Sequence, residues 1–298
     1  MKKTKALVIV GPTASGKSDL AVKLAKKLGG EIISADSRQV YKGLNIGTGK
    51  ITKSEMKDTT HHLLDVANPK EQFSASDYRS LAEPVMERVV GNNKLPIIVG
   101  GTGFYIDALT STTSLPEVVP NEKLRKKLTK KSAEELFEIL EKKDLRRAKT
   151  IDTKNKVRLI RALEIIEALG KVPKPQTNKS SPYEFIYIGL RPIDLDERIR
   201  LRLKRRLAGI IAESKKLHSQ GLSYKRMDEL GLEYRYTALY LQGKLDKKEM
   251  EGKLNIEIRR YAKRQMTWFK RNKKIQWFKS EEYSDIEKYA RIALEKGD

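Results

Sequence analysis

The sequence feature that most restricts the fold is the stretch Gly11-Pro12-Thr13-Ala14-Ser15-Gly16-Lys17-Ser18, which fits G-x-x-x-x-G-K-[ST] at every fixed position. An apolar run, residues 6–10, comes directly before it and is typical of a buried parallel strand. Leucines follow at helical spacing until the glycines at 29–30. The loop is therefore predicted to join a strand to a helix N-terminus, where free N–H groups and the helix dipole bind phosphate.

Two side chains of this loop suit a polyphosphate ligand. Lys17 can place a positive charge on the terminal phosphate, and Ser18 can offer its hydroxyl to Mg²⁺. The alternative is a glycine-rich turn without a ligand. The pattern does not distinguish one polyphosphate from another.

The rest of the sequence predicts an α/β protein with a P-loop NTPase-like parallel sheet core. Further strands are expected at 31–35, 95–99 and 183–190, which are short apolar runs rich in β-branched or aromatic residues. Residues 121–170 lack strand signals and predict an inserted all-helical domain. Its helices are expected at 121–130, 132–142 and 154–169. The predicted domains are 1–112 (first part of the core), 113–182 (helical insertion) and 183–298 (completion of the core with basic C-terminal helices).

The positive charge is concentrated in the C-terminal part of the chain. The whole sequence has a net charge of +23. Residues 1–110 hold 16 Lys and Arg against 11 Asp and Glu, whereas residues 191–279 hold 25 against 11. This asymmetry predicts a polyanionic partner larger than a nucleotide. The alternative is a lysine-rich composition that serves solubility.

The composition excludes several classes of protein. The chain has no cysteine, so disulfides, thiolate metal sites and a cysteine nucleophile are impossible. No stretch approaches 18 apolar residues, so a membrane span is not predicted. The basic N-terminus leads directly into the strand before the phosphate loop, which argues against a cleaved signal peptide. A cytoplasmic monomer is expected.

Two polar side chains follow predicted strands. Asp36 comes directly after residues 31–35, and ligands of open α/β sheets bind beyond the carboxyl ends of strands. It could bind Mg²⁺ or accept a proton from a nucleophile; alternatively, it caps a turn. Thr102 follows strand 95–99, which ends without the carboxylate typical of NTP hydrolases. Thr102 is a candidate hydrogen-bond donor or, alternatively, a helix cap.

His61 and His62 lack a third metal ligand, so they are expected to position a loop.

Two predicted C-terminal helices carry basic faces. In the helix that starts at Asp194, arginines recur at spacing four at Arg198, Arg202 and Arg206. They form either a solvated face or a set from which one arginine reaches the diphosphate. In the predicted helix 255–274, basic residues alternate with aromatic residues, as in RNA-binding surfaces. The aromatic side chains are alternatively part of the core.

Six stretches together resemble one family, the tRNA dimethylallyltransferases (tRNA isopentenyltransferases). They are GPTASGKS, DSRQVYKGLNIGTGK, HHLLDV, PIIVGGTGFY, RLIRALE at 158–164 and RRYAKRQMTWF at 259–269. The resemblance implies transfer of a dimethylallyl group from its diphosphate to N6 of the adenosine directly 3′ of the anticodon, in tRNAs reading codons that begin with U. The phosphate loop would then hold an isoprenyl diphosphate rather than ATP, with Mg²⁺ as cofactor.

The resemblance also implies roles for the matching residues. Asp36 would accept a proton or hydrogen bond from the adenine amino group, while Thr13, Arg202, Lys17 and Mg²⁺ on Ser18 would neutralise the leaving diphosphate. The residues implied to bind the diphosphate are Gly11, Pro12, Thr13, Ala14, Ser15, Gly16, Lys17 and Ser18. The residues implied to bind the tRNA anticodon arm are Asp36, Ser37, Arg38, Gln39, Thr102, Arg125, Arg158, Arg161, Arg260, Lys263 and Arg264.

One stretch departs from the family pattern. The family often has His-Pro-Asn-Asp before the RxxRALE helix, whereas this chain has Asp152-Thr153-Lys154-Asn155, in which Asp152 or Thr153 could still cap the helix.

Three other functions stay open on the sequence. They are prenyl transfer to free AMP, ADP or ATP, a small-molecule P-loop kinase activity, and RNA binding without catalysis.

Overall fold

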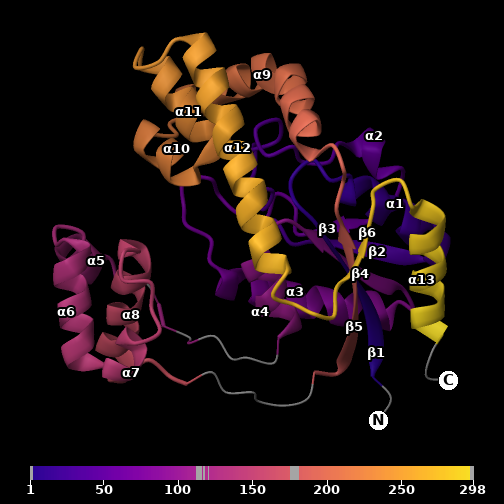
Figure 1. The fold of residues 1–298 in the computed structure, drawn as a ribbon, viewed down its shortest axis with the longest axis horizontal. Helices are drawn as coiled ribbons and strands as arrows, with labels where there is room; N and C mark the ends of the chain where they lie inside the picture. The colour runs from indigo at the N-terminus through magenta and orange to yellow at the C-terminus, as the bar shows by residue number, and fades with distance from the viewer. Residues whose placement is uncertain (1–2, 112–115, 117, 120, 175–180, 296–298) are drawn as a thin grey trace. The chain divides into compact units, whose positions relative to one another are not determined.

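The computed structural model describes residues 3–111, 116, 118–119, 121–174 and 181–295. The chain forms two compact units: Met1–Ser111 with Ser181–Asp298, and Thr112–Ser180. The first unit contains the sheet and the long C-terminal helices, and the helices of the second unit are α5 to α8 (Figure 1). The predicted helical insertion, 113–182, lies partly outside the described residues.

The first unit is built on a parallel sheet, as predicted. In the described part of this unit, six strands have the order β3-β2-β4-β1-β5-β6, and every neighbouring pair is parallel. The strands are β1 Thr4–Val10, β2 Gly30–Ser34, β3 His61–His62, β4 Leu95–Gly100, β5 Tyr183–Leu190 and β6 Gln276–Phe278. The strand before the phosphate loop, β1, lies between β4 and β5. The carboxyl ends of these strands therefore meet at one edge of the sheet.

Helices bury the central strands, which explains why β1 reads as a continuous apolar run. One core cluster joins Leu7 and Ile9 of β1 to Leu20 and Leu24 of α1 and to Ile286 of α13. In Figure 1, α1 and α13 accordingly lie on the same side of the sheet. The helices around the sheet are α1 Lys17–Leu28, α2 Lys53–Met56, α3 Ala75–Gly91, α4 Gly103–Thr110 and α13 Tyr283–Glu295.

Two long helices, α9 and α12, pack against each other beyond the sheet. They are part of a series consisting of α9 Leu195–Ser219, α10 Tyr224–Leu230, α11 Leu232–Leu241 and α12 Lys247–Phe269. Ile199 and Leu203 of α9 share a cluster with Leu254 and Ile258 of α12. The predicted start of α12 at residue 255 is wrong, because Asp246 forms a capping box with Glu249 and starts the helix earlier. Among the described residues, no helix is long and apolar enough to cross a membrane.

The second unit is a small helical bundle. Its helices are α5 Glu122–Leu128, α6 Ala133–Lys143, α7 Leu145–Ala148 and α8 Lys156–Leu169. Leu136 and Leu140 of α6 share a core with Leu159 and Leu163 of α8. The expected cap by Asp152 or Thr153 is wrong, because the Asn155 side chain accepts the N–H of Arg158 instead. Residues 152–155, which depart from the family pattern, thus still supply the N-cap of α8.

Candidate active site

The phosphate loop has the position that the sequence predicts. β1 ends at Val10, and α1 begins at Lys17 after Gly16, which takes a left-handed conformation with φ of 86°. Glycine adopts this conformation without steric cost. Nζ of Lys17 donates to the carbonyl of Pro12 at 3.2 Å. Burial lowers the pKa of Lys17 to about 8; the Asp36 carboxylate opposes this shift and Arg202 adds to it. Lys17 is therefore a poorly solvated cation that an anionic ligand would stabilise.

Asp36 lies beyond the end of β2 and holds the turn that follows. Its Oδ1 accepts the N–H groups of Arg38 and Gln39 at 2.9 and 3.3 Å. The alternative that Asp36 caps a turn is thus confirmed, and Oδ1 is the atom that does so. Within the described part of the chain, Oδ2 accepts no hydrogen bond, and Asp36 lines a cavity together with Lys17 and Ser18. One oxygen positions the turn, and the other is available to a substrate.

Thr102 joins the end of β4 to the same turn. Its Oγ1 accepts the N–H of Ser37 at 2.9 Å and donates to Oγ of Ser37 at 3.2 Å. Although Thr102 is the N-cap residue of α4, its side chain makes no capping hydrogen bond. The alternative of a side-chain cap is therefore wrong. Thr102 instead fixes the residue next to Asp36.

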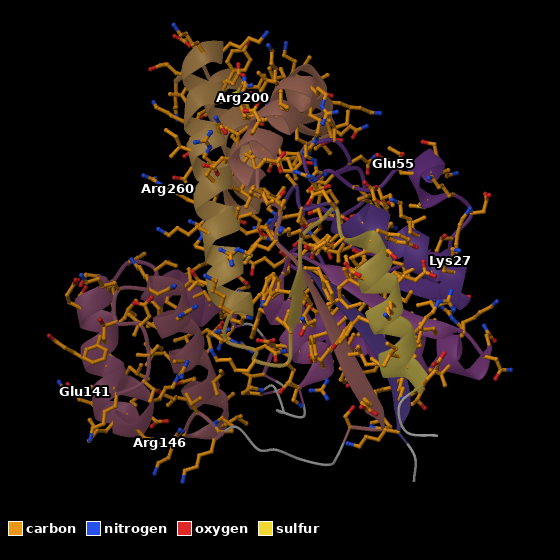
Figure 2. All side chains as sticks on the ribbon, turned by 45° about the vertical axis from the view of Figure 1, so that its right-hand side comes forward. Lys27, Glu55, Glu141, Arg146, Arg200 and Arg260 are labelled. Atoms are coloured by element: carbon orange, nitrogen blue, oxygen red, sulfur yellow. The ribbon has the colours of Figure 1, made fainter. Side chains whose placement is uncertain are left out.

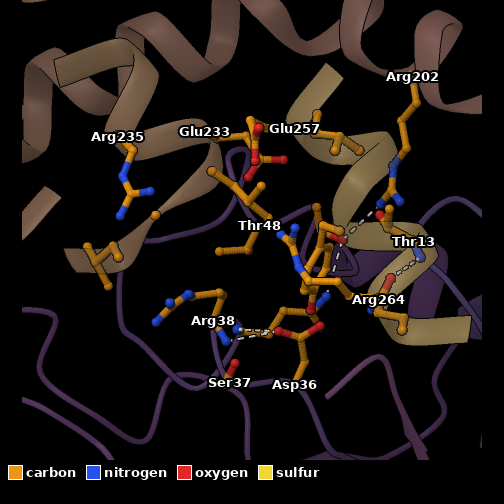
Figure 3. Close-up of a pocket in the computed structure, with 18 of the residues that line it drawn as sticks. Thr13, Asp36, Ser37, Arg38, Thr48, Arg202, Glu233, Arg235, Glu257 and Arg264 are labelled. Carbon is orange, nitrogen blue, oxygen red and sulfur yellow. Dashed lines mark hydrogen bonds between the residues drawn. The ribbon is translucent and has the colours of Figure 1, made fainter. Parts of the chain in front are cut away.

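A cavity of about 360 Å³ brings together nine of the twenty predicted site residues. Figure 3 shows Asp36 and Arg38 on one side of it and Glu233 and Glu257 on the opposite side. The predicted residues that line it are Thr13, Lys17, Ser18, Asp36, Ser37, Arg38, Gln39, Arg202 and Arg264. Cations from α9 and α12 thus face the strand-end carboxylate and the phosphate loop within one space.

Arg202 and Lys17 also line a second cavity, together with the phosphate-loop residues Ala14, Ser15 and Gly16. This cavity has a volume of about 420 Å³ and includes Arg198 and Arg205 of α9. Arg198 is paired with Asp194 and Glu281, both at 2.6 Å. Arg202 donates to the carbonyl of Gly49 at 3.3 Å and lines both cavities. Of the three arginines at spacing four, Arg202 is the one that lines both cavities with Lys17 and Ser18.

The glycine-rich loop at 44–49 is held by α9 and α11, and two of the residues that hold it, Glu213 and Tyr234, were not indicated by the sequence. Glu213 accepts three consecutive N–H groups, from Asn45, Ile46 and Gly47, at 2.9, 2.7 and 2.8 Å. The hydroxyl of Tyr234 donates to the same carboxylate at 2.8 Å. Arg206 donates to the carbonyl of Gly47 at 3.0 Å. These contacts fix the loop that carries Gly49, the partner of Arg202.

The remaining predicted RNA-binding residues fall into two groups. Arg260 and Lys263 are exposed on α12, outside the main cavity, and line a shallow hollow with Trp268 and Arg271; Figure 2 shows Arg260 pointing outward from the helix. In the second unit, Arg158 is exposed, whereas Arg125 and Arg161 bind Glu164 at 2.7 and 3.4 Å. The side chain of Glu164 is fully buried, so this pairing has a structural role. Contact of these residues with RNA stays a prediction.

His61 and His62 form β3 and have structural partners. His62 Nε2 contacts Glu31 at 2.7 Å, and Nδ1 of His61 contacts the carbonyl of Thr59 at 2.8 Å. Among the described residues, no group of three or more His, Asp and Glu side chains could hold a metal ion.

The lowered pKa of Lys17 predicts how diphosphate binding depends on pH. Lys17 is charged below about pH 8 and neutral above it, and a phosphate anion requires the charged form. Affinity for a diphosphate should therefore fall by up to about tenfold per pH unit above about pH 8. Calorimetry without RNA measures this directly.

The control for this prediction is Lys17→Arg, whose guanidinium stays charged throughout the alkaline range. It should show no such decline, whatever its absolute affinity. The same decline in both proteins would assign the titration to another group.

The fold and the site define an α/β protein of the P-loop class, with a cavity that is lined by phosphate-loop residues and a strand-end carboxylate. The model of the family described as IPP transferase matches residues 39–272. The chain belongs to this family. It is 40% identical to tRNA dimethylallyltransferase 1 of Syntrophus aciditrophicus over 290 residues, covering 94% of this chain and 95% of the relative. It is 43% identical to tRNA dimethylallyltransferase 2 of Treponema denticola, covering 91% and 93%.

A solved structure gives the same result. The crystal structure of the full-length tRNA isopentenylpyrophosphate transferase from Bacillus halodurans is 36% identical in sequence and has a TM-score of 0.74. The alignment covers 99% of this chain and 98% of that protein. The predicted fold class and family are thereby confirmed.

Proposed function

We propose that this protein transfers a dimethylallyl group from dimethylallyl diphosphate to N6 of the adenosine directly 3′ of the anticodon, in tRNAs that read codons beginning with U. The reaction would take place in the cavity of about 360 Å³. Diphosphate is the other product. The observation that carries the proposal is that Asp36, Lys17 and Ser18 line one cavity together with Arg202 of α9 and Arg264 of α12. The names of the similar proteins agree with this reaction.

The proposed reaction is a displacement at C1 of the dimethylallyl group. The adenine N6 atom forms a bond to C1 while the bond from C1 to the bridging oxygen breaks, and its electron pair leaves with the diphosphate. N6 is a weak nucleophile because its lone pair is delocalised into the ring, so Oδ2 of Asp36 accepts the N6 proton. Lys17, Arg202 and Thr13 stabilise the charge that develops on the diphosphate.

Mg²⁺ is proposed as the cofactor, and the residues present fit it. A small space of about 20 Å³ lies between Lys17, Ser18 and Asp36, which is room for one ion or water. A hydroxyl and a carboxylate are oxygen donors of the kind Mg²⁺ prefers, and Mg²⁺ commonly takes its other ligands from phosphate and water. Ser18 would hold the ion, which would neutralise diphosphate charge when bound.

The tRNA anticodon arm is the proposed partner of the basic surfaces. The target adenosine would be flipped out of its stack, as enzymes that act on a base require. Ser37, Arg38, Gln39 and Thr102 would contact this adenosine and its neighbours, because they surround Asp36. The proposed contacts to the rest of the arm are Arg264, Arg260 and Lys263 on α12, and Arg125, Arg158 and Arg161 in the helical unit. A cytoplasmic monomer is proposed.

The direct test is mass spectrometry of nucleosides from an anticodon stem-loop RNA after incubation with dimethylallyl diphosphate and Mg²⁺. We expect the adenosine 3′ of the anticodon to gain one dimethylallyl group, and a stem-loop with guanosine there to gain none. Modification of free AMP, ADP or ATP in preference to the stem-loop would favour the mononucleotide prenyltransferase. Transfer of the ATP γ-phosphate to a small molecule would favour a kinase.

Binding of the stem-loop should be strongly salt-dependent. If about four cations contact phosphates, the affinity should fall roughly fiftyfold between about 50 and 200 mM salt, because counterions are released on binding. The double variant Arg260→Gln with Lys263→Gln should reduce the slope of log affinity against log salt by about 1.4. A flat dependence in the parent protein would show that the basic helices do not hold the RNA.

A further inference from the structure

One buried amide contacts both loops of the proposed site. Gln265 lies on α12 and is only 5% exposed. Its Oε1 accepts the N–H of Thr13 at 2.8 Å, and its Nε2 donates to the carbonyl of Gly101 at 2.8 Å. One partner can only donate and the other can only accept, so the orientation of the amide is fixed by its partners.

The two contacted residues belong to the two loops that would hold the two substrates. Thr13 is in the phosphate loop, whereas Gly101 directly precedes Thr102, which holds Ser37 beside Asp36. The contact with Gly101 is close: a Cβ atom there would lie 2.4 Å from Nε2 of Gln265. Any other residue at position 101 would therefore displace the amide. Gln265 thus sets the spacing between the diphosphate loop and the turn that carries the proposed base.

We infer that Gln265 is a positioning residue for the diphosphate. Because the N–H of Thr13 donates to the side-chain oxygen of Gln265, this N–H is not available to a phosphate. The phosphate loop then presents the N–H groups nearer the start of α1, together with Lys17, and directs the Thr13 side chain into the cavity. This inference rests on the proposed function, and it adds a residue of α12 that acts through Thr13 rather than by touching the substrate.

Precise spacing matters because displacements of about 1 Å can reduce an enzymatic rate about a hundredfold. A purely structural role is the competing explanation, since a buried amide with both groups satisfied also stabilises the fold. The two explanations differ in what they predict below the melting temperature. A positioning residue alters diphosphate affinity and turnover in a fully folded protein, whereas a structural residue alters only the melting temperature.

The test compares Gln265→Met, which has similar length but no hydrogen bonds, with the parent protein. We expect a roughly tenfold weaker Kd for dimethylallyl diphosphate without RNA and a kcat about a hundredfold lower, with the Kd of the stem-loop within about twofold. The matched control is Ser214→Ala, which removes the buried hydrogen bond of 2.8 Å between Ser214 and Thr237, away from both loops. It should lower Tm and leave the diphosphate Kd unchanged.

A second variant, Gln265→Glu, probes the same contact by pH. A protonated glutamic acid can accept from Thr13 and donate to the carbonyl of Gly101, as the amide does, whereas the carboxylate cannot donate. Diphosphate affinity of this variant, relative to the parent, should therefore improve as the pH is lowered. The control Ser214→Ala should show no such pH-dependent gain.

The inference is overturned if Gln265→Met lowers Tm as Ser214→Ala does but keeps the parental Kd and kcat. It is also overturned if the affinity of Gln265→Glu relative to the parent does not change with pH. Because the Kd measurement requires no RNA, it remains decisive even if the parent protein binds dimethylallyl diphosphate but fails to modify the stem-loop. That last result would refute the proposed function alone.

Discussion

Asp36→Asn should lower kcat by about a thousandfold, within the range that removal of a general base produces. Asparagine is nearly isosteric, and its side-chain oxygen can still accept the N–H groups of Arg38 and Gln39, which Oδ1 of Asp36 accepts in the parent. The turn should therefore persist. The amide nitrogen that replaces Oδ2 cannot accept the N6 proton. Single-turnover kinetics with saturating stem-loop and dimethylallyl diphosphate measures the loss.

The matched control is Asp77→Asn, which replaces the carboxylate of the α3 capping box. It changes the same functional group outside the cavity, and kcat should stay within about twofold of the parent value, as for most surface substitutions. The Kd of the stem-loop should change little in Asp36→Asn. An equal loss of RNA affinity and turnover would make Asp36 a binding residue and not the base.

Lys17→Met should lower kcat/KM for dimethylallyl diphosphate by about a thousandfold, as loss of a charged donor to a developing anion commonly does. Methionine fills similar space but carries no charge. Because burial already lowers the pKa of Lys17 to about 8, its charge is costly in the ligand-free protein. The substitution should therefore leave Tm equal or higher, which separates lost substrate binding from unfolding.

Lys26→Met is the control for this substitution, because Lys26 is exposed on the same helix. It should keep the parental kcat/KM. The stem-loop Kd should be unaffected by Lys17→Met. If Lys17→Met weakened RNA binding as much as diphosphate binding, Lys17 would contact the RNA and not the leaving group.

The parts of the site that the sequence predicted are those set by local order along the chain. The apolar run of β1, the glycine-rich loop and the leucine spacing of α1 are consecutive, so each constrains the next. The positions of Asp36 and Thr102 followed from a general property of parallel sheets, in which strand ends share one edge. No contact between distant residues was needed for these predictions.

The parts that the sequence did not predict depend on partners far along the chain. Gln265 lies 252 residues from Thr13, and an amide within a basic and aromatic run resembles any polar helix residue. Glu213 likewise reaches its three N–H partners across at least 166 residues. Its position on a mostly basic helix gave no signal that it binds backbone groups.

The pairing of Arg125 and Arg161 with Glu164 was likewise not predicted, and the contact of these arginines with RNA stays a prediction. In a basic helical segment they resemble RNA-contacting residues, and Glu164 resembles an ordinary surface carboxylate. The structure buries Glu164 completely and pairs it with both arginines. Burial of this kind depends on how α5 packs against α8, which hydrophobic spacing alone does not determine.

The separation of Gln265 and Thr13 along the chain has a consequence for biosynthesis. The ribosome makes the phosphate loop before the side chain that fixes Thr13, which follows about 250 residues later. β1 similarly lacks its neighbour β5 until residues 183–190 are made. While these residues are being made, a nascent chain therefore carries the complete phosphate-loop motif without the contact that holds it in place. If the contact is needed as we infer, catalytic competence is acquired only after residue 265 has been made.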